Sequence, residues 1–148
     1  MLYMKDIMKE ELDYILIDHT ADIGIKVKAT NLEGLFIKAA LALIHLILGK
    51  IPEEKYDILK LEIEGEDISD LMLNWLREIL YLFEGEKKIF TNAKIFSINY
   101  NRIFADIYYV PFDIKKYEVQ YEIKAVTYHQ LNVFKNNQYW QASIIFDV

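Results

Sequence analysis

One segment constrains the fold of this chain more than any other, because its apolar residues recur at helical spacing. The apolar positions are Leu32, Leu35, Phe36, Ala39, Ala40, Leu43, Ile44 and Ile47. Thr30-Asn31-Leu32-Glu33 matches a capping box, in which Thr30 and Glu33 satisfy free backbone donors, and Gly49 predicts the end of the helix. A helix this apolar has to be covered by other elements, most economically by one face of a sheet.

The rest of the chain supplies a second helix and enough strands for that sheet. A helical pattern begins at Asp67 or Ser69 and runs to Glu84, with Gly85 as its stop. Alternating or β-branched segments predict strands at Tyr14–Asp18, Ile23–Ala29, Ile58–Glu64, Ala93–Asn99, Ile103–Val110, Val119–Val133 and Tyr139–Phe146. Because strands follow one another in runs, we predict an α+β fold of two layers: a largely antiparallel sheet with both helices packed on one face.

Length and composition predict one globular domain without a membrane segment. The chain has 148 residues, of which 53% are hydrophobic and 27% charged, and no cysteine. Residues 1–13 are predicted to be an N-terminal extension with a weak helical turn, and residues 14–148 the domain. The longest apolar run, Ala39–Leu48, is interrupted by His45 and is too short to span a bilayer. A secretory h-region is missing from the start, so we expect a cytoplasmic protein.

The net charge of −6 bears on the class of partner. Phosphate contacts need clustered Lys and Arg, so the charge argues against broad nucleic-acid binding by the chain alone. An acidic protein can still dock on the basic surface of an RNA-binding enzyme. The charge therefore favours a protein partner over broad binding of nucleic acid by the chain alone.

Two acidic stretches stand where predicted strands end. Asp18-His19-Thr20-Ala21-Asp22 follows one strand, and Asp147-Val148 follows the last. Carboxylates at strand ends are held by a stiff scaffold and can converge on a cation, although Asp is also common in turns. In an extended segment Asp18, Thr20 and Asp22 would share one side and His19 the other.

Three segments resemble the archease family. They are Asp18–Gly24 (DHTADIG), Glu122–His129 (EIKAVTYH) and the ending Ile144–Val148 (IIFDV). They occur in the family's order, and the similarity extends from about Tyr14 to Val148. The resemblance implies a small accessory protein of the RtcB-type RNA ligase, which seals tRNA halves after intron removal. It also implies a bound divalent cation and a role in helping the ligase to become guanylylated and to turn over.

The resemblance assigns the cation site to three residues. Asp22 and Asp147 match the acidic ligands of the family, and Val148 matches the position that contributes a C-terminal oxygen. Such hard oxygen ligands favour Ca²⁺, Mg²⁺ or Mn²⁺ over Zn²⁺, and Ca²⁺ is the cation that we expect.

Other residues of the motifs have two interpretations each. Asp18 either stands beside the cation or caps the turn at Thr20, and His19 is either a ligand or a structural hydrogen-bonding group. His129 either orients a carboxylate or is an exposed residue at a strand end. Tyr117 occupies a position where the family often has His, so no role of that His is transferred.

Aromatic residues and the remaining histidine are predicted to be structural. His45 lies on the first helix without a matching His or Cys, and Trp75 belongs to the core. The Tyr108-Tyr109 pair and Trp140 could stack on bases, but without interleaved Arg we expect them to pack within the sheet.

The motifs that are missing argue against an independent enzyme. The sequence has no Gly-x-x-x-x-Gly-Lys-Ser/Thr loop, no Gly-x-Gly-x-x-Gly fingerprint and no Gly-x-Ser-x-Gly elbow. We therefore predict no catalytic and no nucleotide-binding residues. The alternatives are a metal-dependent hydrolase that uses the same carboxylates with His129 as acid or base, and a chaperone-like binding module.

Overall fold

The computed structural model describes residues 12–18, 22–54 and 56–148. This part contains seven strands and two helices in the predicted order. In chain order they are β1 (Tyr14–Asp18), β2 (Asp22–Ala29), α2 (Leu32–Leu48), β3 (Asp57–Glu64), α3 (Ile68–Glu86), β4 (Lys88–Ile98), β5 (Arg102–Pro111), β6 (Ala125–Lys135) and β7 (Trp140–Asp147). None of the helices in the described residues is long and apolar enough to cross a membrane.

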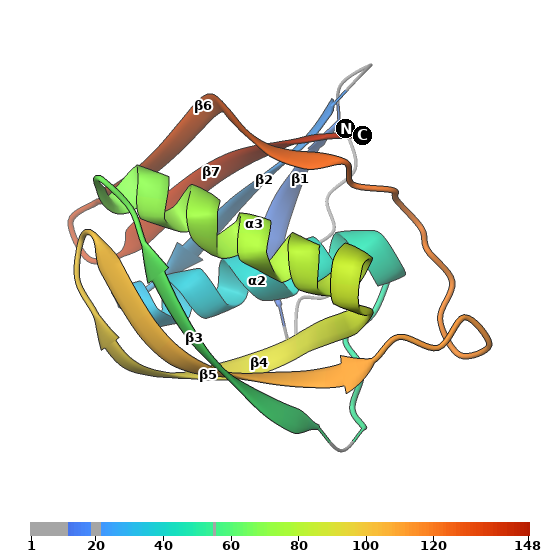
Figure 1. Cartoon of the computed structure of the whole chain (residues 1–148). Helices are drawn as coiled ribbons and strands as arrows, with labels where there is room; N and C mark the ends of the chain where they lie inside the picture. Colours follow the sequence, from blue (N-terminus) through green and yellow to red (C-terminus); the bar gives the residue numbers. More distant parts are fainter. Residues whose placement is uncertain (1–11, 19–21, 55) are drawn as a thin grey trace.

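The strands form two antiparallel sheets, with the orders β1-β2-β7-β6 and β3-β5-β4. Figure 1 shows α2 and α3 lying between these sheets. The predicted α+β class with antiparallel strands is confirmed, but the strands divide between two sheets instead of forming one. The physical reason lies in α2, where every residue from Ala42 to Leu48 is buried. Seven consecutive residues go around the whole helix, so α2 needs cover on all sides.

The first helix starts and stops close to its predicted ends. Its N-cap is Asn31, whose side chain accepts a hydrogen bond from the Gly34 N–H at 2.7 Å. The capping box predicted from Thr30 is therefore wrong by one residue, because Asn31 has the extended backbone that a cap requires. Gly49 ends the helix as predicted, with φ of 74° and its N–H bonded to the His45 carbonyl at 2.7 Å.

Helix α3 extends two residues beyond its predicted end at Glu84 and ends at Glu86. Asp67 caps its start, since its side chain accepts from the Asp70 N–H at 2.8 Å. Gly85 lies inside the helix, and Lys87 takes the left-handed conformation that ends it, with φ of 57°. The Lys87 N–H bonds to the carbonyls of Leu82 and Phe83, which compensates for the strain of a non-glycine residue there.

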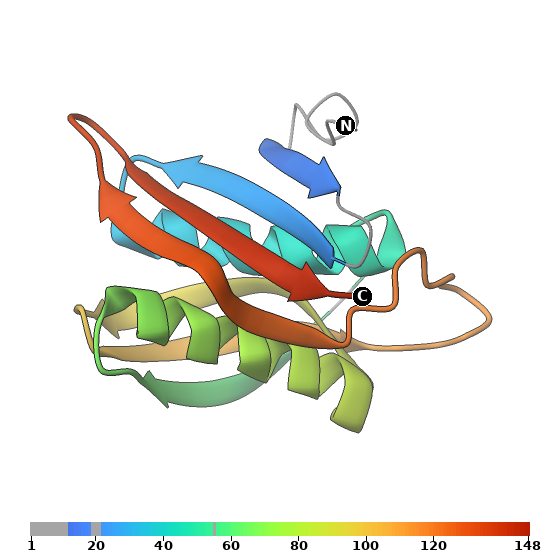
Figure 2. The same cartoon turned by 90° about the horizontal axis from the view of Figure 1, so that it is seen from above.

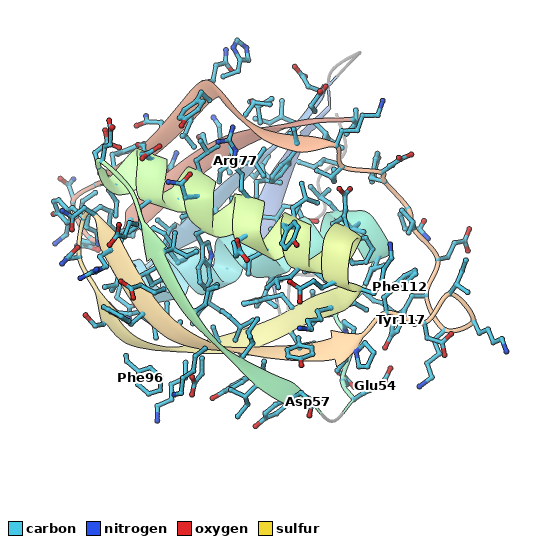
Figure 3. The ribbon with its side chains drawn as sticks, in the orientation of Figure 1. Glu54, Asp57, Arg77, Phe96, Phe112 and Tyr117 are labelled. Carbon is cyan, nitrogen blue, oxygen red and sulfur yellow. The ribbon has the colours of Figure 1, made fainter. Side chains whose placement is uncertain are left out.

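The connection between the two sheets is longer than predicted. The strand expected from Val119 begins only at Ala125, and residues 112–124 form an irregular segment. Tyr117 is buried in it, and its hydroxyl donates to Glu54 (Figure 3). Burial and this bond raise the pKa of Tyr117 to about 12. The Gln120 N–H also donates a hydrogen bond to the Ile47 carbonyl of α2 at 2.6 Å. The backbone of this segment is therefore hydrogen-bonded in part to a helix and not to a strand.

The core reaches beyond the predicted start of the domain. Leu12 is buried among the core residues, although the sequence analysis assigned it to the N-terminal extension. The weak helical turn predicted for the extension lies outside the described residues, apart from Leu12 and Asp13.

Candidate metal centre

Asp22 and Asp147 are direct partners across two neighbouring strands. Asp22 is the first residue of β2, Asp147 is the last residue of β7, and the antiparallel register pairs them. Figure 2 shows the end of β7 beside the start of β2. Directly opposed residues share a face of the sheet, with Cβ atoms about 4.5–5.5 Å apart. The two residues therefore lie opposite each other on neighbouring strands, and β2 separates β7 from β1.

The side chain of Asp22 is held in an unusual environment. Its Oδ1 atom is buried and has no hydrogen-bond partner among the described residues. A buried carboxylate oxygen without a partner costs free energy, and the negative charge of Asp147 opposite adds repulsion. A bound cation would remove both penalties, so this pair fits a divalent cation with oxygen ligands.

An apolar row lies beside the two carboxylates on the same face. Gly24 pairs with Ile145, two residues along each strand from Asp22 and Asp147. A Cβ atom on Gly24 would come within 2.7 Å of the Ile145 Cδ1 atom, so any larger residue there would displace the end of this side chain. The sequence analysis missed this role, although a glycine inside an alternating strand was a usable signal. A buried apolar neighbour of this kind lowers the local dielectric, which would strengthen the attraction between the carboxylates and a cation.

The end of β7 is fixed by a third strand. Ala125 at the start of β6 pairs with Asp147, and the Lys124 N–H donates to the Asp147 carbonyl at 2.7 Å. The side chain of Lys124 itself is exposed. Val148 is half-buried and packs against the core. Its contribution of an oxygen ligand stays a prediction.

The remaining candidates near Asp22 fall on the part of the chain that is not described. The backbone of Asp18 pairs with Ile23, but the Asp18 side chain, His19 and Thr20 lie outside the described residues. Within residues 12–18, 22–54 and 56–148 no group of three or more His, Cys, Asp or Glu gathers around one point. Since Ca²⁺ takes about 6–8 oxygens, the two carboxylates supply only part of a ligand set.

His129 is separated from the carboxylate pair by a large bulge in β6. The register of β6 with β7 jumps from Thr127–Ile145 to Asn132–Ser143. The alternation expected from Ala125 to His129 therefore breaks after Thr127. His129 is exposed and pairs with no residue of β7, and its N–H bonds to the Thr127 Oγ1 atom at 3.3 Å. The structure thus agrees with the interpretation of His129 as an exposed residue.

A second buried polar group is His45, predicted to be structural. Its Nδ1 atom and the Tyr14 hydroxyl are 2.8 Å apart, and the imidazole is almost fully buried. Burial lowers the pKa of His45, and burial together with nearby Tyr121 raises the pKa of Tyr14. This pair joins β1 to α2 inside the core.

The model of the archease protein family matches residues 14–148, which include Asp22, Asp147 and the row beside them. The chain belongs to the archease family. It is 31% identical to protein archease of Methanosarcina barkeri over 139 residues, which cover 91% of this chain and 95% of that protein. It is 33% identical to protein archease of Pyrococcus furiosus over 135 residues, which cover 88% and 95%.

Solved structures show the same fold at lower identity. A solution structure from Methanobacterium thermoautotrophicum has a TM-score of 0.71 at 22% identity and covers 91% of this chain and 98% of that one. A crystal structure from Thermotoga maritima, described as an archease and possible chaperone, has a TM-score of 0.61 at 21% identity and covers 89% and 94%. At this identity the two structures support the archease fold alone.

Proposed function

We propose that this archease binds a divalent cation through Asp22 and Asp147 and activates an RtcB-type tRNA-splicing RNA ligase. The observation that carries the proposal is the buried, unpartnered Oδ1 atom of Asp22 opposite a second carboxylate. Both residues lie in the segments whose sequence resembles the archease signatures. Ca²⁺ is the expected cation, with Mg²⁺ or Mn²⁺ as alternatives.

The chain's own residues contribute position and charge. The strand ends hold the two carboxylates opposite each other, and the Lys124–Asp147 backbone bond restrains the end of β7. The buried Ile145 side chain packs against Gly24 beside the pair. A cation held there by Asp22 and Asp147 would supply positive charge to offset the phosphate charge during guanylate transfer.

The nucleotide and the nucleophile belong to the ligase in this proposal. The described histidines support this division, because His45 is buried against Tyr14 and His129 is separated from the carboxylates by the bulge. The protein would therefore be an accessory factor that promotes guanylylation and repeated turnover of a GTP-dependent ligase. It would act in the cytoplasm with its ligase and meet RNA only through it.

A single-turnover guanylylation assay of the cognate ligase tests the proposal. At limiting cation, the wild-type protein should raise the rate, whereas Asp22→Asn and Asp147→Asn should not. Asp57→Asn is the matched control, because Asp57 is an exposed carboxylate on the other sheet. Normal stimulation by either site variant would refute the proposal. GTP hydrolysis or RNA cleavage by the purified protein, lost in Asp22→Ala, would instead identify a metal-dependent hydrolase.

A further inference from the structure

The face of the β3-β5-β4 sheet that points away from the helices carries large exposed apolar side chains. Tyr56, Ile58 and Phe96 are 53%, 56% and 55% exposed, and Phe104 is also exposed. In Figure 3 the Phe96 side chain projects from the sheet on the side away from α2 and α3. Monomeric proteins seldom gather such side chains on one surface without a partner. We call these residues, together with the charged side chains of the same strand face, the outer face.

The charges of the outer face are arranged in rows across the strands. Lys60 and Asp106 are register partners, and Asp106 also pairs with Lys94, so this row is basic. Two residues further along, Glu62 stands opposite Phe104, and the next row pairs Glu64 with Arg102.

These two rows are acidic overall, because they contain two glutamates and one arginine, and Arg102 forms an ion pair with each glutamate at 2.7 Å. Three basic and three acidic side chains therefore balance on the outer face, in a chain whose net charge is −6.

This balance selects the class of partner. Single-stranded RNA would require an excess of Lys and Arg, and a basic protein would require an excess of acid. A surface whose basic row adjoins an acidic row is complementary to itself. We propose that the outer face binds a second copy of this chain in a two-fold symmetric dimer.

The charge pattern also selects the direction of the two-fold axis. An axis across the strands, between the rows of Lys60 and Glu62, places Lys60 of each copy over Glu62 of the other. An axis along the strands would place Lys60 over Lys94 and bring like charges together. Lys60 is available for such a contact, since its side chain is 85% exposed. Its ion pair with Asp106, at 3.4 Å, leaves most of the side chain in solvent.

The centre of the outer face is shaped for a contact between apolar groups. A hollow of about 320 Å³ is lined by Lys60, Glu62, Phe96 and Phe104, among others. The proposed axis passes over this hollow, so the exposed ring of Phe96 from each copy meets the other near the axis. Symmetric contacts of this kind use the same patch twice.

The dimer should be weak and depend on concentration. Three strands about 4.8 Å apart and four rows about 6.8 Å apart make a face of roughly 15 by 25 Å. This is smaller than the roughly 800 Å² per partner of a standard stable interface. The proposal does not depend on the ligase or on a cation.

Sedimentation equilibrium of the full chain over a wide concentration range, at low and high salt, tests the proposal. Wild-type protein should dimerise reversibly, and Lys60→Glu and Glu62→Lys should each weaken the dimer at least tenfold, because each places two like-charge pairs across the axis. An equimolar mixture of the two variants should restore dimerisation, because a heterodimer has attractive pairs at both positions. Phe96→Ser should weaken the dimer without changing its salt dependence.

Lys115→Glu and Glu118→Lys are the matched controls, since both residues are exposed on the 112–124 segment and the substitutions make the same changes in net charge. They should leave the dimer unchanged. A wild-type protein that is monomeric at all concentrations, or a variant mixture that stays monomeric, would overturn the proposal. Binding of a fluorescent single-stranded RNA by the monomer, lost in Phe96→Ser, would overturn it in favour of a nucleic-acid surface.

Discussion

Two buried polar atoms of this protein have no hydrogen-bond partner among the described residues: Oδ1 of Asp22 and Nε2 of His45. Their surroundings differ. Asp22 stands at a strand end opposite Asp147, beside the row of Gly24 and Ile145. His45 lies in the core, and its other ring nitrogen is bonded to Tyr14.

The comparison teaches when a buried polar atom indicates a ligand. An imidazole can stay neutral, and burial lowers the pKa of His45 in that direction. One hydrogen bond then suffices to keep it in the core. Two ionised carboxylates opposite each other are both acceptors, so neither can satisfy the other, whereas a cation would serve both. The missing partner therefore supports the proposed cation at Asp22 and no ligand at His45.

The largest expected effect is on stimulation of the ligase, which should depend on Asp22 and Asp147 but not on His45. Asp22→Ala and Asp147→Ala should each reduce stimulation of the ligase at least tenfold, because each removes a cation ligand, while the circular dichroism spectrum stays unchanged. His45→Gln keeps a polar group beside Tyr14 and should stimulate normally. The comparison would fail if His45→Gln lost stimulation while Asp22→Ala kept it.

The next effect is the response of stability to Ca²⁺. At about 100 times its Kd the ion should stabilise the wild-type fold by about 2.7 kcal/mol, because it binds only the folded state. Thermal or urea unfolding with and without Ca²⁺ measures this increment. Asp22→Asn should lose it and His45→Phe should keep it. An equal increment in Asp22→Asn would place the cation elsewhere.

A smaller effect concerns the core pair itself. His45→Phe leaves the buried Tyr14 hydroxyl without its partner, so it should destabilise the fold by about 1–3 kcal/mol. The double variant Tyr14→Phe/His45→Phe removes both polar groups and should cost less than the sum of the two single changes. Urea unfolding of the four proteins gives the coupling. Additive costs would mean that the hydrogen bond contributes nothing.

The smallest effect is a dependence of stability on pH. The folded pKa of His45 lies below its unfolded value, so the unfolded state binds the proton first as pH falls. The contribution of His45 is thus fully present above about pH 6.5 and declines below it, by at most about 1.4 kcal/mol per pH unit. Unfolding at pH 7.5, 6.5 and 5.5 should show a steeper decline for wild type than for His45→Phe. Parallel curves would show that His45 titrates alike in both states.

Local patterns in the sequence predicted the kind and order of the elements. The stop at Gly49 and the alternation in Ile58–Glu64 depend on neighbouring residues, so the sequence specifies them directly. Details that depend on distant partners were missed. The bulge after Thr127 and the bond from Tyr117 to Glu54 belong to this class, because segments far apart in sequence create them.

For the candidate site, the sequence alone determined that Asp22 and Asp147 each stand at the end of a strand. Only the tertiary structure decided that these ends are opposite each other, because β7 is inserted between β2 and β6. The register between β2 and β7 follows from burying Ile23, Ile25 and Phe146 on one face of the sheet. A shift of one residue would send these side chains to the other face, so the packing of the core also aligns the carboxylates.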